Sequence, residues 1–143
     1  MSKRRFLALA CLLLPPALPA AAADGPQPGL WKVTVTTESD GVAAPARVSE
    51  RCLKPEQLNA LDKTFAPELG AACTRTAYEW TGRRLSWRIA CTAPVAMDNS
   101  GWYEFDSAAH YRGELIVTMI VPGGTNMIAR TRIEGERVGA CPP

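Results

Sequence analysis

The chain has 143 residues, of which 47% are hydrophobic and 21% charged, a composition typical of a folded globular protein and too apolar for intrinsic disorder. Residues 24–143, which remain after a predicted export signal, suffice for one domain and exclude two packed domains. Because Lys3, Arg4 and Arg5 belong to that signal, 13 of the 16 basic residues remain against 14 acidic ones, and this net charge of −1 argues against binding to nucleic acid or to an anionic membrane.

Residues 1–23 are predicted to be a cleaved export signal. Met1–Arg5 is cationic, Phe6–Leu14 is a short apolar run, and Ala21-Ala22-Ala23 supplies the small residues that signal peptidase requires. The apolar run is much shorter than the roughly twenty residues that a membrane-spanning helix needs. We therefore expect a periplasmic or secreted bacterial protein without a membrane span, whose single β-rich domain is residues 24–143.

The first half of this domain predicts two strands and one short helix. Leu30–Thr36 alternates between apolar and polar residues, which is typical of a half-buried strand. After the Asp40-Gly41 turn a second strand is expected at Ala46–Cys52, with its polar and apolar residues on opposite sides. Lys54–Leu61 is the one convincing helix, because a proline and a glutamate open it and leucines recur on one side.

The next segment predicts a hairpin of two strands. Gly82-Arg83 fits a two-residue turn, which places Trp80 opposite Leu85 and Tyr78 opposite Trp87. The apolar faces of the two strands then coincide. This agreement between turn geometry and apolar pattern supports the pairing.

Four cysteines remain in the exported chain, and an even number in a small exported domain predicts two disulfides. Their wide spacing lacks the close pairs of zinc modules, so we expect no metal and no cofactor. The predicted hairpin puts Cys91 opposite Thr74, so that Cys73 and Cys91 project to opposite faces and cannot bridge without a bulge. We therefore predict the disulfides Cys52–Cys73 and Cys91–Cys141.

Three further strands are expected in the second half. A loop at Pro94–Ser100 leads to a strand at Gly101–Ser107, a longer strand follows at about Tyr111–Val121, and Met127–Glu134 returns after the Pro122-Gly123-Gly124 turn. About seven strands with one short helix predict an all-β domain, built on a single curled antiparallel sheet. A barrel or half-barrel is the expected form, and a sandwich is the alternative.

Residues spread along the domain resemble a known family. They are Pro28-Gly29-Leu30-Trp31, Arg51-Cys52-Leu53 before Pro55-Glu56, Cys73 with Tyr78, Gly82, Trp87 and Cys91, and the closing Gly139-Ala140-Cys141. In this order and at these intervals they are similar to the small exported bacterial proteins grouped as domain of unknown function 3617. The resemblance covers nearly the whole domain. It implies a periplasmic address and a β-rich, disulfide-bonded domain, and it implies no activity.

Aromatic residues give the most informative candidate binding site. Most of them fall on predicted strands, where they either fill the interior of the sheet or line an apolar pocket. Trp87 and Tyr78 belong to an apolar strand face, whereas Trp102 shares a face with Glu104 and Asp106. An exposed tryptophan beside two carboxylates suggests a contact surface for a cationic ligand or for a partner protein.

Evidence for catalysis in the sequence is weak. His110 is the only histidine, it is expected in a loop, and no nucleophile motif accompanies it. Glu104 and Asp106 point the same way from one strand, as an acid/base pair requires, but a solvated strand face is the commoner reason for such a pattern. Rows of arginine are able to grip a phosphate or carboxylate: Arg84 with Arg88, and Arg130 with Arg132.

Three functions follow in order of support. The first is a periplasmic, non-enzymatic binding or interaction module for a small apolar or cationic ligand or for an envelope protein. The second is an inhibitor or chaperone-like partner of an envelope protein, which uses a protruding loop at Thr92–Ser100. The third is a carboxylate-based hydrolase. A cavity above roughly 300 Å³ lined by aromatic side chains favours the first, a packed interior with a protruding loop the second, and two converging carboxyl groups the third.

Overall fold

The computed structural model describes residues 25–143, so the predicted export signal lies outside the described residues. Within that range, eight strands form one antiparallel sheet. The strands are β1 (Gly29–Ser39), β2 (Val42–Ala43), β3 (Arg47–Leu53), β4 (Cys73–Trp80), β5 (Arg84–Cys91), β6 (Met97–Ser107), β7 (His110–Met119) and β8 (Met127–Gly139). Two short helices, α1 (Pro55–Leu58) and α2 (Leu61–Phe65), separate β3 from β4. The prediction of a β-dominated domain is confirmed.

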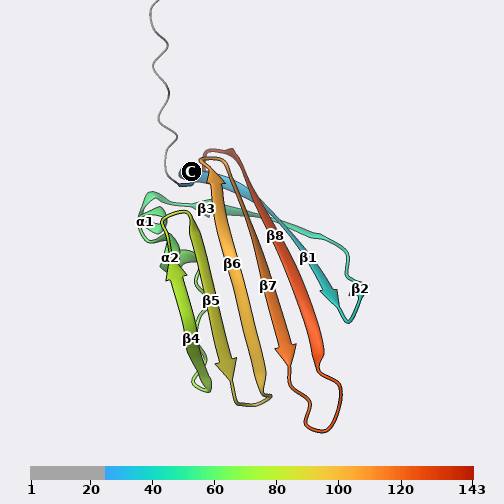
Figure 1. Cartoon of the computed structure of the whole chain (residues 1–143). Coiled ribbons are helices and arrows are strands. Elements are labelled where there is room, and N and C mark those ends of the chain that lie inside the picture. Colours follow the sequence, from blue (N-terminus) through green and yellow to red (C-terminus); the bar gives the residue numbers. More distant parts are fainter. Residues whose placement is uncertain (1–24) are drawn as a thin grey trace, which may run out of the picture.

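The first and last long strands lie side by side inside the sheet. The strand order is β2-β1-β8-β7-β6-β5-β4, and β3 pairs with β1 along the same edge as β2. Figure 1 shows the twisted sheet with α1 and α2 gathered near one end. In the part of the chain that the structure describes, β3 and β4 do not pair with each other. The sheet is therefore an open half-barrel, one of the two forms that the sequence predicts.

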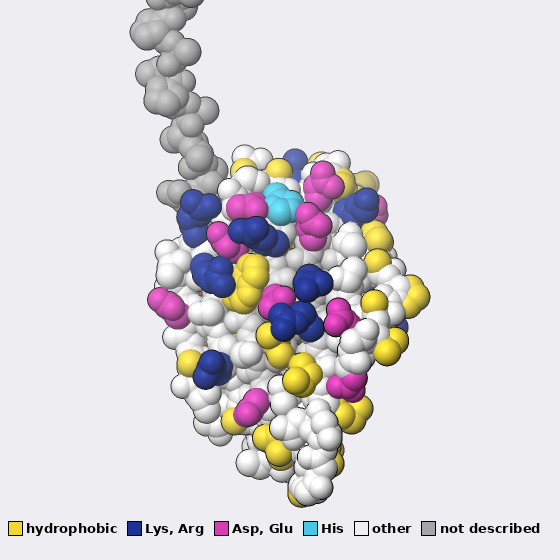
Figure 2. All heavy atoms as spheres, turned by 45° about the vertical axis from the view of Figure 1, so that its right-hand side comes forward, with side chains coloured by type: hydrophobic (Ala, Val, Ile, Leu, Met, Phe, Trp, Pro, Cys, Tyr) yellow, Lys and Arg dark blue, Asp and Glu magenta, His cyan; other side chains and the backbone are white. Residues whose placement is uncertain are grey.

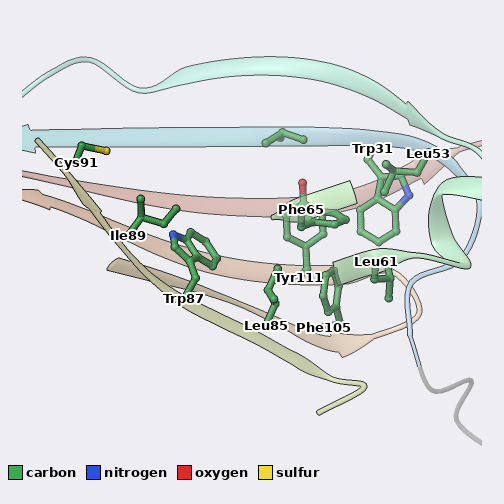
Figure 3. Packing of buried hydrophobic residues seen from close by; sticks show 11 residues of the cluster. Trp31, Leu53, Leu61, Phe65, Leu85, Trp87, Ile89, Cys91, Phe105 and Tyr111 are labelled. Atoms are coloured by element: carbon green, nitrogen blue, oxygen red, sulfur yellow. The ribbon is translucent and has the colours of Figure 1, made fainter. Parts of the chain in front are cut away.

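The core lies on the inner face of this curved sheet, where α2 covers it. The ring of Phe65 projects into the core (Figure 3), and its centroid is 5.1 Å from that of Tyr103, 5.0 Å from that of Phe105 and 5.1 Å from that of Tyr111. The predicted helix ends at Leu61, so it omits Phe65. The structure instead has a second helical turn, in which Leu61 and Phe65 are four residues apart and both buried.

Aromatic rings lie over glycines on this inner face. A Cβ atom at any of three glycines would collide with the ring on the neighbouring strand. Glycine therefore leaves the space that each ring needs in order to lie against the next strand. The directly opposed pairs are Trp87 with Gly101, Tyr103 with Gly113, and Tyr111 with Gly135.

The hairpin of β4 and β5 keeps the predicted register near its turn but not throughout. Tyr78 lies opposite Trp87, as predicted. Beyond it, β4 contains a bulge at Thr76, and the extra residue places Cys73 directly opposite Cys91. The two cysteines are therefore on the same face and form a disulfide, with their Cα atoms 4.0 Å apart.

Two disulfides are present as expected, but the predicted pairing is wrong. The bridges join Cys73 to Cys91 and Cys52 to Cys141. Cys52 and Cys141 are 89 positions apart in the sequence. They meet because β3 and β8 flank the same end of β1, where Leu30 lies opposite Cys52 on one side and opposite residue 139 on the other.

The loop before β6 is shorter than predicted. Met97–Ser100 was expected in a loop but belongs to β6, and Met97 lies opposite Cys91. Asn99 accepts a hydrogen bond of 3.3 Å from Nε1 of Trp87. The backbone at the start of β6 is thus paired into the sheet instead of forming a protruding loop.

The residues of β3 face in unexpected directions. Its apolar Val48 is 59% exposed, whereas Arg51 lies opposite Trp31, whose side chain is fully buried in the core. The guanidinium of Arg51 lies 5.1 Å from the centroid of the Phe65 ring. The contact between Arg51 and Phe65 is a cation–π contact at the margin of the core. It lies on the face of β3 where the sequence pattern would lead one to expect the apolar side chains.

Candidate functional site

The outer face of the sheet is hollowed above its central strands. This outer hollow has a volume of about 470 Å³ and spans residues of β1, β6, β7 and β8. Figure 2 shows acidic and basic side chains interspersed around the histidine on the surface of the molecule. The side chains that matter below line this hollow: Thr34, Trp102, His110, Arg112, Arg132 and Glu134.

The register of the sheet brings these residues together from distant parts of the sequence. Residues directly opposite each other on neighbouring strands point to the same face, so each row of opposed residues forms one line across the sheet. Two such rows cross the outer hollow. They are Trp102, Glu114, Arg132 and Thr36, and, beside them, Glu104, Arg112, Glu134 and Thr34.

Trp102 lies on the outer face together with Glu104, as the alternation of β6 predicts. Its ring is half-buried. The guanidinium of Arg84 lies 4.3 Å from the ring centroid, in a cation–π contact. Trp102 also separates the outer hollow from a smaller one of about 210 Å³, which Arg84 lines. One side of the Trp102 ring is therefore already covered by a cation of the same chain, Arg84.

Glu104 is shared by two arginines on the neighbouring strands. Its carboxylate accepts a hydrogen bond of 3.2 Å from Arg84 and a longer one of 3.4 Å from Arg112. Both arginines lie directly opposite Glu104, on β5 and β7. Glu104 therefore holds two positive charges on the outer face and is not free to act with a second carboxyl group.

Glu114 makes a similar pair of contacts on β8. Arg130 donates a hydrogen bond of 2.8 Å to its carboxylate. The nearest nitrogen of Arg132 is 3.7 Å from the other carboxylate oxygen, which is an ion pair without a direct hydrogen bond. Glu114 is thus bound closely by one arginine and loosely by the other.

His110 is held between two carboxylates at the edge of the outer hollow. Its Nδ1 is 2.7 Å from an oxygen of Asp106, and its Nε2 is 3.0 Å from an oxygen of Glu134. The hydrogen bond to Glu134 raises the pKa of His110 above the ordinary 6.5, partial burial opposes this, and Asp106 raises the pKa further. The sequence predicts that His110 lies in a loop. This prediction is wrong, because His110 is the first residue of β7.

Asp106 reaches His110 because β6 is irregular at this point. A bulge lies between Phe105 and Ser107, so Asp106 has no residue opposite it on β7. Its carboxylate turns to the imidazole instead. Glu104 and Asp106 therefore bind different basic partners, and each carboxylate stabilises the surface through its own ion pair.

The charges of this surface are balanced. Its ion pairs join four arginines, four carboxylates and His110. The network has no net charge while His110 is neutral and a charge of +1 when it is protonated. Positive and negative side chains therefore alternate across this surface, and neither sign of charge dominates it.

The other two candidate residues, Trp87 and Tyr78, lie away from the outer hollow. Trp87 is buried in the core, 5.7 Å from the ring of Tyr103. Tyr78 is 40% exposed near the edge of the sheet, and its hydroxyl donates a hydrogen bond of 3.0 Å to Asp62 of α2. Burial and this bond to Asp62 raise the pKa of Tyr78. The five candidates thus belong to three separate environments.

Sequence reasoning named several residues around Trp102, among them Asp106, His110 and Arg132, but it did not single out Arg112 or Glu134. Arg112 and Glu114 alternate with apolar residues on β7, and Arg132 and Glu134 do the same on β8. This alternation was visible in the sequence and predicts an exposed face. Which charges meet which was not visible, because it depends on the register between strands.

Residues 25–143 contain no group of three or more histidine, cysteine, aspartate or glutamate side chains arranged to hold a metal ion. No helix in the same range has the length and apolar character needed to cross a membrane.

The comparisons with known proteins identify a family and nothing closer. No curated protein and no solved structure matches the chain. A family described as a protein of unknown function, DUF3617, matches residues 26–141. The match includes all eight strands and all four cysteines of the disulfides. The chain therefore belongs to the DUF3617 family.

Proposed function

We propose that this protein is a non-enzymatic binding or interaction module of the bacterial periplasm, which contacts its ligand or partner at the outer hollow. The observation that carries the proposal is the hollow itself. Its volume of about 470 Å³ is within the range of pockets that receive small molecules or a partner's side chains. A half-buried tryptophan forms part of its wall.

The composition of the hollow supports binding. Tryptophan and arginine are the side chains that contribute most to contacts between proteins and their partners. Trp102 combines an apolar ring with a position among the charges, and Arg112 and Arg132 are 57% and 65% exposed. A ligand that covers this surface would bury apolar area and form ion pairs at the same time.

The contacts of the candidate catalytic residues argue against a hydrolase. An acid/base pair needs two carboxyl groups that converge on one substrate bond. Glu104 is bound by Arg84 and Arg112, whereas Asp106 is bound by His110. Each of the two carboxylates therefore takes part in its own ion pairs on the outer face.

The inhibitor proposal has less support, because its candidate loop is shorter than predicted. Only Thr92–Ala96 separates β5 from β6, and Met97 packs against the core. The aromatic interior, by contrast, is closely packed around Phe65, as that proposal required. A partner protein therefore remains a suitable ligand, but with the outer face as its contact surface.

The periplasmic address rests on the predicted signal and on the disulfides. Two disulfides tie the domain together, and such bonds persist in oxidising compartments outside the cytosol. Export through the predicted signal would deliver the chain to such a compartment.

Native mass spectrometry tests the proposal with protein isolated from the envelope of its own host. We expect wild-type protein to retain a small molecule or a partner that Trp102→Ala has lost. Val48→Ala is the matched control, because Val48 is exposed on the outer side of β3 and does not line the outer hollow. Equal retention by wild type and Trp102→Ala would contradict the proposal.

A stability measurement separates loss of binding from loss of folding. Trp102→Ala should leave the melting temperature within a few degrees, because the removed ring is only half-buried. Trp87→Ala should cost roughly 3 to 5 kcal/mol of unfolding free energy, because Trp87 is buried in the core. If Trp102→Ala were as destabilising as Trp87→Ala, Trp102 would be a core residue and not a contact residue.

A further inference from the structure

We propose that the outer hollow binds an oxyanion of its ligand, a carboxylate or a phosphate group, between the guanidinium groups of Arg112 and Arg132. The inference rests on the proposed function, because it names the chemistry of the group that the hollow receives. It follows from how the arginines of the outer face are paired.

Each of two glutamates on this face has a shorter contact with one arginine and a longer contact with another, and the arginine with the longer contact is called loosely bound below. Glu104 is 3.2 Å from Arg84 and 3.4 Å from Arg112. Glu114 is 2.8 Å from Arg130 and 3.7 Å from Arg132. The two loosely bound arginines are also the more exposed member of each pair, at 57% and 65% against 45% and 41%.

The two loosely bound arginines are neighbours. Arg112 lies opposite Glu134, and Arg132 lies opposite Glu114, so the arginines occupy diagonal positions on adjacent strands of the same face. Diagonal neighbours lie within reach of each other when their side chains are long. Both guanidinium groups line the outer hollow, whereas Arg84 and Arg130 do not.

These guanidinium groups have donors to spare. A guanidinium carries five N–H groups, of which Arg112 uses one in its long bond to Glu104. Arg132 makes its ion pair at a distance beyond a hydrogen bond. Two planar groups with free N–H donors match the geometry of a carboxylate or phosphate, which accepts paired hydrogen bonds.

The carboxylates that line the same hollow already have close partners. Asp106 and Glu134 share His110, and Glu114 accepts the 2.8 Å bond from Arg130. An added anion therefore replaces solvent at the exposed N–H groups of Arg112 and Arg132, whereas these carboxylates already accept bonds from other side chains. Thr34 and Thr36 line the opposite wall and offer hydroxyl groups to the rest of the ligand.

Side-chain NMR of the exported chain tests this assignment. The Nε–Hε signals of all arginines are followed during separate titrations with sodium acetate and sodium phosphate, at an ionic strength held constant with sodium chloride. We expect saturable shifts at Arg112 and Arg132, and no saturable shift at Arg83, which is exposed in the turn before β5. Whether acetate or phosphate saturates at lower concentration distinguishes a carboxylate ligand from a phosphorylated one.

Paired variants make the outcome decisive. The double variant Arg112→Gln/Arg132→Gln should weaken anion binding at least about tenfold, because each lost charge-assisted bond removes a strong contact. Arg83→Gln should leave it unchanged. All three substituted arginines are exposed, so the melting temperatures should stay close to that of wild type. Linear shifts at every arginine, or undiminished binding by the double variant, would overturn the assignment.

The proposed function can survive that result. If Trp102→Ala still releases the retained ligand while the arginine variants bind anions normally, the hollow is a binding site of another chemistry. If the arginine variants lose anion binding but Trp102→Ala retains the native ligand, the oxyanion site stands and the larger contact surface does not.

Discussion

Trp87 and Trp102 show that successive residue pairs along two neighbouring strands point to opposite faces of this sheet. Trp87 lies opposite Gly101 on the inner face, and the next pair along the same two strands, Ser86 and Trp102, points outward. The first tryptophan fills the core and the second borders the outer hollow. Their different environments follow from strand alternation alone, which is why the sequence could separate them.

The titration of His110 is the clearest pH-dependent property of this surface. We expect NMR to give His110 a pKa above 6.5, and Glu134→Gln should lower that pKa, because the hydrogen bond to Glu134 is the largest cause of the increase. A His110 pKa unchanged by Glu134→Gln would show that the contact is absent in solution.

The raised pKa of His110 also determines whether the contribution of this residue to stability rises or falls with pH. A pKa that is higher in the folded than in the unfolded chain stabilises the fold at low pH. The contribution of His110 is complete below the unfolded value of about 6.5 and is lost as the pH rises through the folded value. Urea unfolding should therefore show that the advantage of wild type over His110→Gln shrinks with rising pH. The effect is small because the imidazole is only partly buried. An advantage that grew with pH would contradict it.

Gly135 tests the pairing of rings with glycines. Gly135→Ala should destabilise the protein by roughly 1 to 3 kcal/mol, because the new methyl group would collide with the ring of Tyr111 across the strand pair. Gly139→Ala, on the same strand, is the control, because no heavy atom lies within 4 Å of the position of its Cβ. Urea denaturation of both variants measures the difference, and equal stabilities would mean that the ring moves aside freely.

At the scale of elements, most strands were predictable and their irregularities were not. The alternation in β1, the turn at residues 82–83 and the long strand β7 all produce local patterns. The bulge at Thr76 produces none, because an extra residue in β4 is defined only by what it pairs with on β5. That one residue decides whether Cys73 can reach Cys91, which is why the predicted disulfides were wrong.

The helical segment shows a related limit. Leu61 and Phe65 have the spacing of one helix face, but a helix of this length has little stability of its own. It forms because Phe65 packs against three aromatic rings that come from β6 and β7. Long-range packing of this kind leaves little trace in the local sequence.

The two disulfides should differ in their contribution to stability. In the chain-entropy description, a bond that spans 89 positions is worth roughly 4 to 5 kcal/mol and one that spans 18 is worth about 3 kcal/mol. Cys52→Ala/Cys141→Ala should therefore lower the unfolding free energy more than Cys73→Ala/Cys91→Ala.

Peptide mapping under non-reducing conditions checks the pairing itself. A tryptic fragment that links Cys52 to Cys141 is expected. A fragment that links Cys52 to Cys73 would restore the pairing predicted from the sequence and overturn the observed register of β4.

At the scale of the whole molecule, the outer face depends on strands that are far apart in the chain. The outer hollow takes residues from β1, β6, β7 and β8, so it exists only when these four strands have paired. The sequence could predict the β-dominated sheet and the shared face of Trp102 and Glu104. It could not predict the balanced network of charges. Which charged residues meet depends on how four strands are aligned with one another.

The pairing of β1 with β8 also governs when the protein can fold. β1 pairs along most of its length with β8, the last strand of the sheet. Because synthesis begins at the N-terminal end, the growing chain presents β1 long before its partner strand is made. Until β8 follows, Trp31 and Val33 have no complete core in which to be buried. The early segments must stay unaggregated during this delay, so the rate of emergence and the availability of chaperones should limit the yield of native protein.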